Sequence, residues 1–99
     1  AVEEYLVQLI MATRHPEKYD NKLGGQVLFG ASPRATIALD RCAKINAWLS
    51  GRDFVAPEDI HAVIYDVLRH RLILTFEAQA EGVTTDDIIG KLLNLVPLP

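Results

Sequence analysis

Residues that start and stop helices divide this 99-residue chain into short segments whose apolar residues recur at helical spacing. The clearest segment runs from Ser32-Pro33 to Gly51. Serine favours the position before a helix, proline suits the first turn, and glycine adopts the left-handed conformation that often ends a helix. The spacing predicts one helix between these points, with a buried stripe formed by Ala38, Cys42, Ile45 and Leu49.

Three further helices are predicted on the same grounds. The first ends before His15-Pro16, the third begins at Pro57, and the last is capped by Thr84 or Thr85. The third has acidic residues in its first turn, where they complement the helix dipole.

The remaining segments are predicted to be less regular. Residues 15–31 contain proline and glycine, and within them residues 26–29 are suited to a short extended segment. Residues 72–80 allow either a short strand or a helical continuation, and we favour a strand that pairs near residues 26–29. The expected fold class is mainly α: a small bundle of about four helices with up to two short β-strands.

Composition excludes several classes of protein. An apolar content of 49% fits one compact domain, and no apolar run approaches the roughly 20 residues of a membrane span. A single cysteine fits a reducing compartment, so we expect a cytoplasmic protein. The net charge of −3 disfavours nucleic acid as a partner. Because the chain starts at Ala1 within a predicted helix and without Met, we expect it to be a fragment.

No catalytic constellation is evident. The Gly24-Gly25 pair is not followed by the Lys-Ser/Thr of a phosphate-binding loop, and Cys42 is predicted to be a packed core thiol. The three histidines lack the spacing of metal ligands; they are His15, His61 and His70. We therefore expect the fragment alone to bind neither metal nor cofactor and to be inactive.

Two basic features could contact a ligand or partner. Arg34 lies in the predicted first turn of a helix, where its positive charge faces the positive end of the helix dipole. This placement destabilises the helix by about 0.3–1 kcal/mol unless an anion binds there. A solvated arginine is the simpler interpretation of its position alone. The cluster Arg69-His70-Arg71 is either a solvated helix end or part of a nucleotide pocket or subunit seam.

Three segments in order resemble the magnesium-chelatase-like lid domain of MoxR-family AAA+ ATPases: Gly30-Ala-Ser-Pro-Arg-Ala35, Gly51-Arg-Asp-Phe-Val-Ala-Pro-Glu-Asp-Ile60 and Val67-Leu-Arg-His-Arg-Leu72. The resemblance runs from about Ala12 to Pro99. It implies that residues 1–99 form a single C-terminal helical lid, with the catalytic AAA+ core upstream of residue 1.

The resemblance also implies roles for individual residues. Arg34 corresponds to the sensor 2 arginine, which reaches the γ-phosphate of ATP. Gly30, Ser32 and Pro33 would position its helix: the glycine permits a turn and the serine caps the helix. Arg69 and Arg71 are candidate seam contacts. Ala56 stands where the family often has Thr, which should weaken the start of the third helix by roughly 1 kcal/mol.

Cofactors and partners follow from the same resemblance. ATP and Mg²⁺ would be bound mainly by the absent core. The expected partners are that core, other protomers of a homo-oligomeric (hexameric) ring, von Willebrand A-domain proteins and client proteins, often metalloenzymes awaiting a cofactor.

Two alternatives stay open on the residues alone. A free-standing, histone-fold-like interaction module would need no nucleotide. A helix-turn-helix DNA-binding unit is disfavoured by the acidic first turn of the third helix and by the net negative charge.

Overall fold

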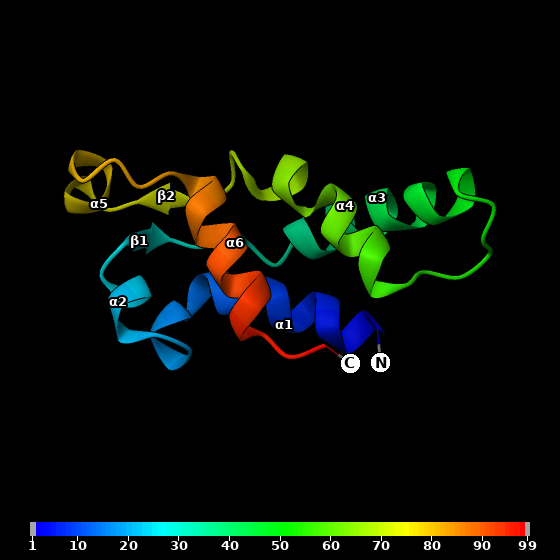
Figure 1. The fold of residues 1–99 in the computed structure, drawn as a ribbon, viewed down its shortest axis with the longest axis horizontal. Coiled ribbons are helices and arrows are strands. Elements are labelled where there is room, and N and C mark those ends of the chain that lie inside the picture. The colour runs from blue at the N-terminus through cyan, green and yellow to red at the C-terminus, as the bar shows by residue number, and fades with distance from the viewer. Residues whose placement is uncertain (1, 99) are drawn as a thin grey trace.

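The computed structural model describes residues 2–98 as an elongated helical bundle with a small sheet at one end (Figure 1). The molecule measures 43 × 21 × 21 Å along its principal axes. The connection between α3 and α4 lies at the end opposite the sheet. Along the chain, the described elements are α1 (Val2–Arg14), the 3₁₀ turn η1 (Pro16–Lys18), α2 (Asn21–Gly24), β1 (Val27–Phe29), α3 (Ala35–Leu49), α4 (Pro57–Leu68), β2 (Ile73–Leu74), α5 (Phe76–Ala80) and α6 (Thr85–Leu95).

The four longer helices share one core, which confirms the predicted mainly α fold class. Helix α3 packs mainly against α4, and α1 contacts α3, α4 and α6. Each of the four contributes fully buried apolar side chains, among them Leu9, Ile10, Leu39, Ile60, Ile64, Ile88 and Ile89. The expected count of about four helices was too low, because the short helices α2 and α5 lie in segments predicted to be irregular or extended.

Helix α3 turns a different face to the core from the one predicted. Its buried residues are Ala35, Leu39, Ala43 and Ala47. Ile45 and Leu49, two of the four predicted core residues, are exposed, and Cys42 is only half-buried. Three of the four buried residues of α3 are alanines, and the larger apolar side chains Ile37, Ile45, Trp48 and Leu49 lie on the exposed side of the helix. The predicted stripe was therefore wrong, as was the placement of the thiol in the core.

The start of α4 is stabilised from inside the helix, although Ala56 offers no capping side chain. The buried carboxylate of Asp59 accepts a hydrogen bond from the Ala56 amide (2.8 Å) and another from the Asn46 side chain (2.8 Å), and it pairs with Arg52. The pKa of Asp59 is lowered, first by the Ala56 amide and then by Asn46 and Arg52, while burial opposes the shift. Asp59 thus offsets the predicted weakness and joins α3 to α4.

The start of α6 and the end of α3 follow the sequence signals. Thr84 caps α6: its hydroxyl accepts from the Asp87 amide (3.2 Å), and the Asp87 carboxylate accepts from the Thr84 amide (2.9 Å). These bonds from Thr84 lower the pKa of Asp87. Gly51 follows α3 with φ +83°, the left-handed conformation predicted for it.

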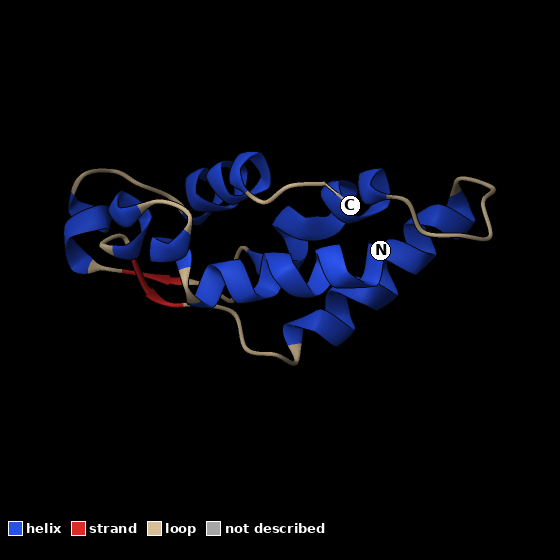
Figure 2. Ribbon diagram, turned by 90° about the horizontal axis from the view of Figure 1, so that it is seen from below, coloured by secondary structure: helices blue, strands red, loops and turns tan. Residues whose placement is uncertain are grey.

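The two strands pair with each other, as predicted, and the structure shows that they run antiparallel, with Val27 opposite Leu74 and Phe29 opposite Ile73. The strand in residues 72–80 is only two residues long and leads directly into α5, which Thr75 caps through the Ala78 amide. Both alternatives for this segment are therefore present in succession. Figure 2 shows the strands together at one end, with helices making up most of the remaining structure. None of the helices within residues 2–98 has the length and apolar character needed to cross a bilayer.

Candidate functional site

The segment before α3 is fastened to the carboxyl end of α1. The Thr13 hydroxyl donates to the Ile10 carbonyl (2.6 Å) and accepts a hydrogen bond from the Ala31 amide (3.0 Å). Gly30 lies so close to α1 that a Cβ on it would be 2.2 Å from the Thr13 carbonyl oxygen. Arg14 adds a longer bond to the Ala31 carbonyl (3.4 Å). Gly30 is therefore required for close approach to α1, whereas the family resemblance implied that it permits a turn.

Arg34 follows this fastened segment on an exposed turn. Hydrogen bonds from the Ala35 amide to the Ser32 carbonyl (2.9 Å) and from the Thr36 amide to the Pro33 carbonyl (3.1 Å) form the turn. Arg34 is exposed between the buried residues Ala31 and Ala35. Its side chain makes no hydrogen bond or ion pair with any residue between 2 and 98. The guanidinium is thus directed to solvent and free to contact something outside this fold.

The predicted helix start needs two corrections. Regular α3 begins at Ala35, so Arg34 immediately precedes the helix instead of lying in its first turn. The Ser32 hydroxyl caps no amide within the described part of the chain, and only its backbone carbonyl takes part in the turn. Pro33 lies in the turn one residue before Arg34, where its ring fixes its own φ angle.

Helix α3 differs electrostatically from the other long helices. Helices α1, α4 and α6 each carry two acidic residues in the first turn, whereas α3 carries none there and has Arg34 beside its amino end. A helix amino end bears partial positive charge, which acids normally balance. An arginine added to that charge makes this end of α3 the part of the fold best suited to an external anion.

Arg69 and Arg71, the candidate seam contacts, are both held within the fold. Arg69 makes a two-bond pair with Asp86 (2.9 and 3.2 Å) and contacts Asp66 (3.2 Å). The bond with Asp86 raises the pKa of Arg69. Arg71 donates to the Val67 carbonyl (2.9 Å) at the end of α4. The structure does not bring either residue to Arg34; it uses Arg69 to join α4 to α6.

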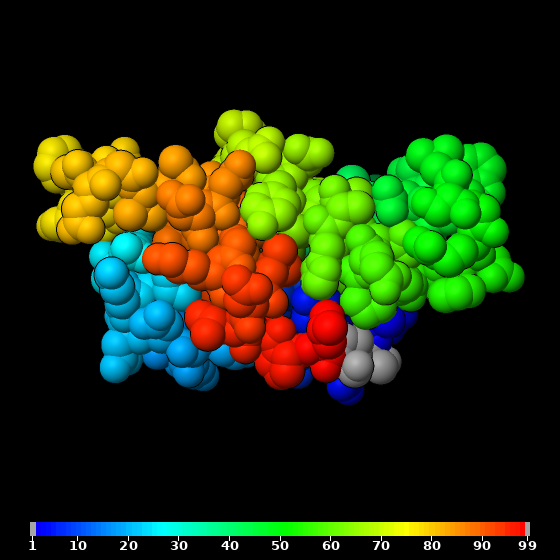
Figure 3. Space-filling view, in the orientation of Figure 1, coloured from blue at the N-terminus to red at the C-terminus, as the bar shows by residue number. Residues whose placement is uncertain are grey.

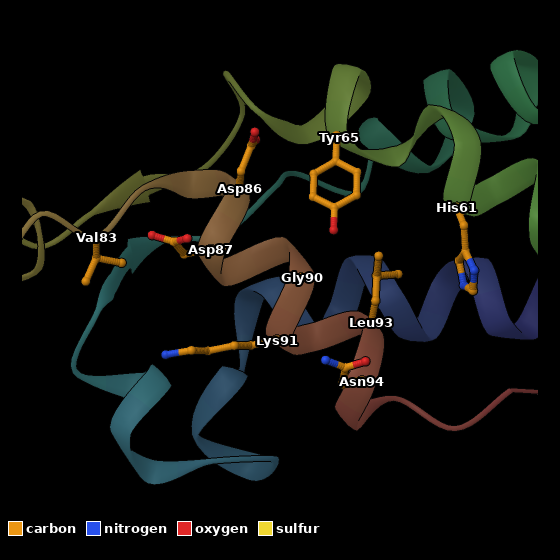
Figure 4. Close-up of a pocket in the computed structure, with 9 residues that line it drawn as sticks. All are labelled: His61, Tyr65, Val83, Asp86, Asp87, Gly90, Lys91, Leu93 and Asn94. Carbon is orange, nitrogen blue, oxygen red and sulfur yellow. The ribbon is translucent and has the colours of Figure 1, made fainter.

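A hollow with polar side chains lies between α4 and α6. Its volume is about 770 Å³, and it is lined by His61, Tyr65, Val83, Asp86, Asp87, Gly90, Lys91, Leu93 and Asn94. In Figure 4, Tyr65 points toward Gly90, while Asp87 and Lys91 point away from both Tyr65 and His61. His61 is half-buried, and its side chain is hydrogen-bonded to the hydroxyl of the buried Tyr5 (2.6 Å), so it belongs to the contact between α1 and α4. The polar groups of this hollow do not converge on one point.

The comparisons with known proteins identify the fold's family. Residues 25–92 match the family model described as "AAA lid domain". The chain is 43% identical over 100 residues to chaperone MoxR1 of Mycobacterium tuberculosis and 38% identical over 106 residues to protein MoxR of Methylorubrum extorquens. A crystal structure from Cytophaga hutchinsonii, of a protein provisionally named an ATPase, superimposes with a TM-score of 0.94 at 45% identity and covers 99% of this chain.

The chain therefore belongs to the AAA lid family, among the lid domains of MoxR-type AAA+ ATPases. All of this chain aligns with each of the two MoxR relatives, but it spans only 26% and 31% of their lengths, and 30% of the solved chain. The family match favours the lid over the histone-fold-like and DNA-binding alternatives.

Proposed function

We propose that this chain is the nucleotide-sensing lid of a longer MoxR-type ATPase, in which Arg34 senses the γ-phosphate of ATP. The observation that carries the proposal is the exposed guanidinium of Arg34, which has no partner within residues 2–98 and lies beside an amino helix end with no acid in its first turn. A planar guanidinium that donates two parallel hydrogen bonds suits phosphate oxygens. The ATP-binding core and its Mg²⁺ would lie in the part of the ATPase outside this chain.

Arg34 would act through a short rigid path. Gly30 and Ala31 are fastened to Thr13, and Pro33 restricts the backbone just before Arg34. A pull on the guanidinium would therefore pass to α1 and α3 together instead of being absorbed by a flexible loop. When hydrolysis removes the γ-phosphate, Arg34 would lose its charged partner and the lid would be free to change its angle, a hinge-type switch.

Wider roles follow from membership in this family. We infer that the longer ATPase hydrolyses ATP with Mg²⁺ and forms a homo-oligomeric ring that remodels client proteins, with von Willebrand A-domain proteins among its partners and metal-cofactor insertion as one outcome. Cytoplasmic location is part of the same proposal. Measurement of the subunit number of the purified ATPase with and without ATP tests the ring.

The direct test is Arg34→Ala in the full-length ATPase. A hydrogen bond to a charged group contributes about 1.5–3 kcal/mol, so its loss in the transition state corresponds to a fall of about 10- to 150-fold in kcat. Arg34→Lys should recover only part of the rate, because lysine lacks the planar fork. Lys18→Ala removes an exposed cation elsewhere on the surface and should leave hydrolysis unchanged. Unchanged hydrolysis and ring formation in Arg34→Ala would refute the proposal.

A further inference from the structure

Helix α3 presents large apolar side chains to solvent along its outer face. Ile37 is 57% exposed, Ile45 55% and Trp48 74%. Leu49 and Phe54 extend this apolar surface where the end of α3 and the following loop project from the body of the molecule (Figure 3). We call Ile37, Arg41, Ile45 and Trp48 the outer face of α3. A continuous apolar surface of this kind is typical of a protein contact.

Arginines provide an independent observation on the same face. Four of the six arginines form hydrogen bonds or ion pairs within the fold: Arg14 with the Ala31 carbonyl, Arg52 with Asp59, Arg69 with Asp86 and Arg71 with the Val67 carbonyl. Among residues 2–98, Arg34 and Arg41 have no such partner, and both are exposed. They are seven residues apart, which is two helical turns or about 10 Å along the axis. Trp48 follows Arg41 by another seven residues and therefore lies on the same side.

We infer that the outer face of α3 is the surface on which an ATP-binding core docks, with Trp48 as the apolar anchor and Arg41 paired to an acidic group of that core. The inference rests on the proposed function, because Arg34 can meet a phosphate held by the core only when the core lies over this side of α3. Ile37, Arg41 and Trp48 follow Arg34 along one side of α3, so a core that extends along this side from Arg34 would cover them too. We assign the core as the occupant because this chain spans only 26% and 31% of the lengths of the two MoxR relatives, which leaves a large part of such an ATPase to cover this face.

The surface beside this face is shaped to receive a ridge of apolar and charged side chains. Two adjoining grooves of about 760 and 440 Å³ run between α1 and α3, and both are lined by Glu3, Leu6 and Asp40. Trp48 and Phe54 border the larger groove and Ile37 borders the smaller one. Asp40 is paired with Lys44 (2.9 Å), and Arg41 lines the smaller groove without an ion-pair partner among residues 2–98. An acidic group of the core that lies at Arg41, flanked by apolar residues that contact Ile37 and Trp48, would complement this part of the surface.

A second exposed apolar patch serves as a control. Phe29, Ile73 and Phe76 are 61%, 52% and 83% exposed at the sheet end of the molecule. Figure 1 places β1, β2 and α5 at the end opposite the α3–α4 connection, and Trp48 lies next to that connection in the last turn of α3. Because Phe29, Ile73 and Phe76 are not part of the outer face of α3, the inference does not predict that the core covers them.

The test uses Trp48 as a probe in the full-length ATPase, with every other tryptophan replaced by Phe. Trp48 is the one tryptophan of this chain. Acrylamide quenching is measured with a non-hydrolysable ATP analogue bound. The reference is the Trp48→Phe/Phe76→Trp variant, which moves the probe to the other patch. We expect the quenching constant of Trp48 to be at least threefold lower than that of the reference. Arg41→Glu should raise it again, and Lys18→Glu should not.

The outcomes separate docking from phosphate sensing. If Trp48 is quenched as readily as the reference, or if Arg41→Glu does not change its quenching, the docking face is overturned. If protection of Trp48 appears only as the protein concentration rises, a second copy covers the face, and the docking of the core is overturned as well. If Trp48 is exposed while Arg34→Ala loses hydrolysis, the sensing role stands and the docking face fails. If Trp48 is protected while Arg34→Ala is fully active, the docking face stands and the sensing role fails.

Discussion

The close approach of Gly30 to α1 makes Gly30→Ala the sharpest test of how the Arg34 segment is held. An added Cβ would be 2.2 Å from the Thr13 carbonyl oxygen, 2.4 Å from the Thr13 carbonyl carbon and 2.6 Å from the Arg14 amide nitrogen. All three are backbone atoms of a helix, so no flexible side chain can move aside. Either α1 distorts or the Gly30–Ala31 segment moves away from it.

Both responses carry a cost that can be bounded. Overpacking in a well-packed region costs about 1–3 kcal/mol. Displacement breaks the bond between Thr13 and the Ala31 amide, and a buried amide left unpaired costs about 1–3 kcal/mol. We expect Gly30→Ala to lower the free energy of unfolding by about 3 kcal/mol. In a domain of this size that corresponds to a fall in Tm of roughly 12–24 °C.

Two other glycines serve as controls in the same thermal and urea denaturation series, followed by circular dichroism. At Gly25, φ is −83° and the nearest atom to an added Cβ is the Lys22 carbonyl oxygen at 3.7 Å, so Gly25→Ala should change stability by no more than about 0.5 kcal/mol. At Gly51 there is open space but φ is +83°, so Gly51→Ala should cost about 1–2 kcal/mol through backbone strain alone. A Gly30→Ala variant as stable as Gly25→Ala would refute the reasoning.

Three further predictions concern the core, a cap and pH. In urea denaturation, Leu39→Ala should lower the free energy of unfolding by about 2–5 kcal/mol, and Leu49→Ala should lower it by no more than about 0.5 kcal/mol. Equal losses in the two variants would contradict the finding that Leu39 is buried and Leu49 is exposed. Thr84→Ala should cost about 1 kcal/mol in the same assay, and partial recovery in Thr84→Ser would confirm that the hydroxyl cap is responsible. Because the pKa of Asp59 is lowered on folding, its contribution is present above the unfolded carboxyl pKa of about 3.9 and is lost as pH falls through the lower folded value. Denaturation of Asp59→Asn between pH 2 and 7 should show a shallower acid decline than the parent chain; identical profiles would contradict this role.

Helix boundaries could be predicted from the sequence because single residues determine them. Thr84 and Gly51 act through their own hydroxyl and their own φ angle, so their roles are readable one residue at a time. The Ser32-Pro33 pair was a less reliable signal for the start of α3, because these residues form a turn and the regular helix begins only at Ala35. The candidate role of Arg34 came from the family resemblance, because the position of Arg34 in the sequence alone left a solvated arginine as the simpler interpretation.

Contacts between distant segments could not be predicted in the same way. No local pattern indicates that Thr13 bonds to the Ala31 amide, or that a glycine 17 residues later must touch its carbonyl. The buried group of Asn46, Arg52 and Asp59 likewise joins positions whose proximity depends on how α3 packs against α4. Such contacts are set by tertiary packing, and the sequence signal for each is only an ordinary polar residue.

The error in α3 has a physical cause that bears on its function. A periodic pattern of apolar residues records every surface that a helix buries, whether the partner lies within the fold or outside it. Helix α3 buries mostly small residues and leaves large ones outward, so two large residues of its predicted stripe, Ile45 and Leu49, are exposed. A helix selected only for this fold would gain nothing from the exposed Trp48. The outward stripe is accounted for if α3 has two partners, α4 through its alanines and an ATP-binding core through its large side chains.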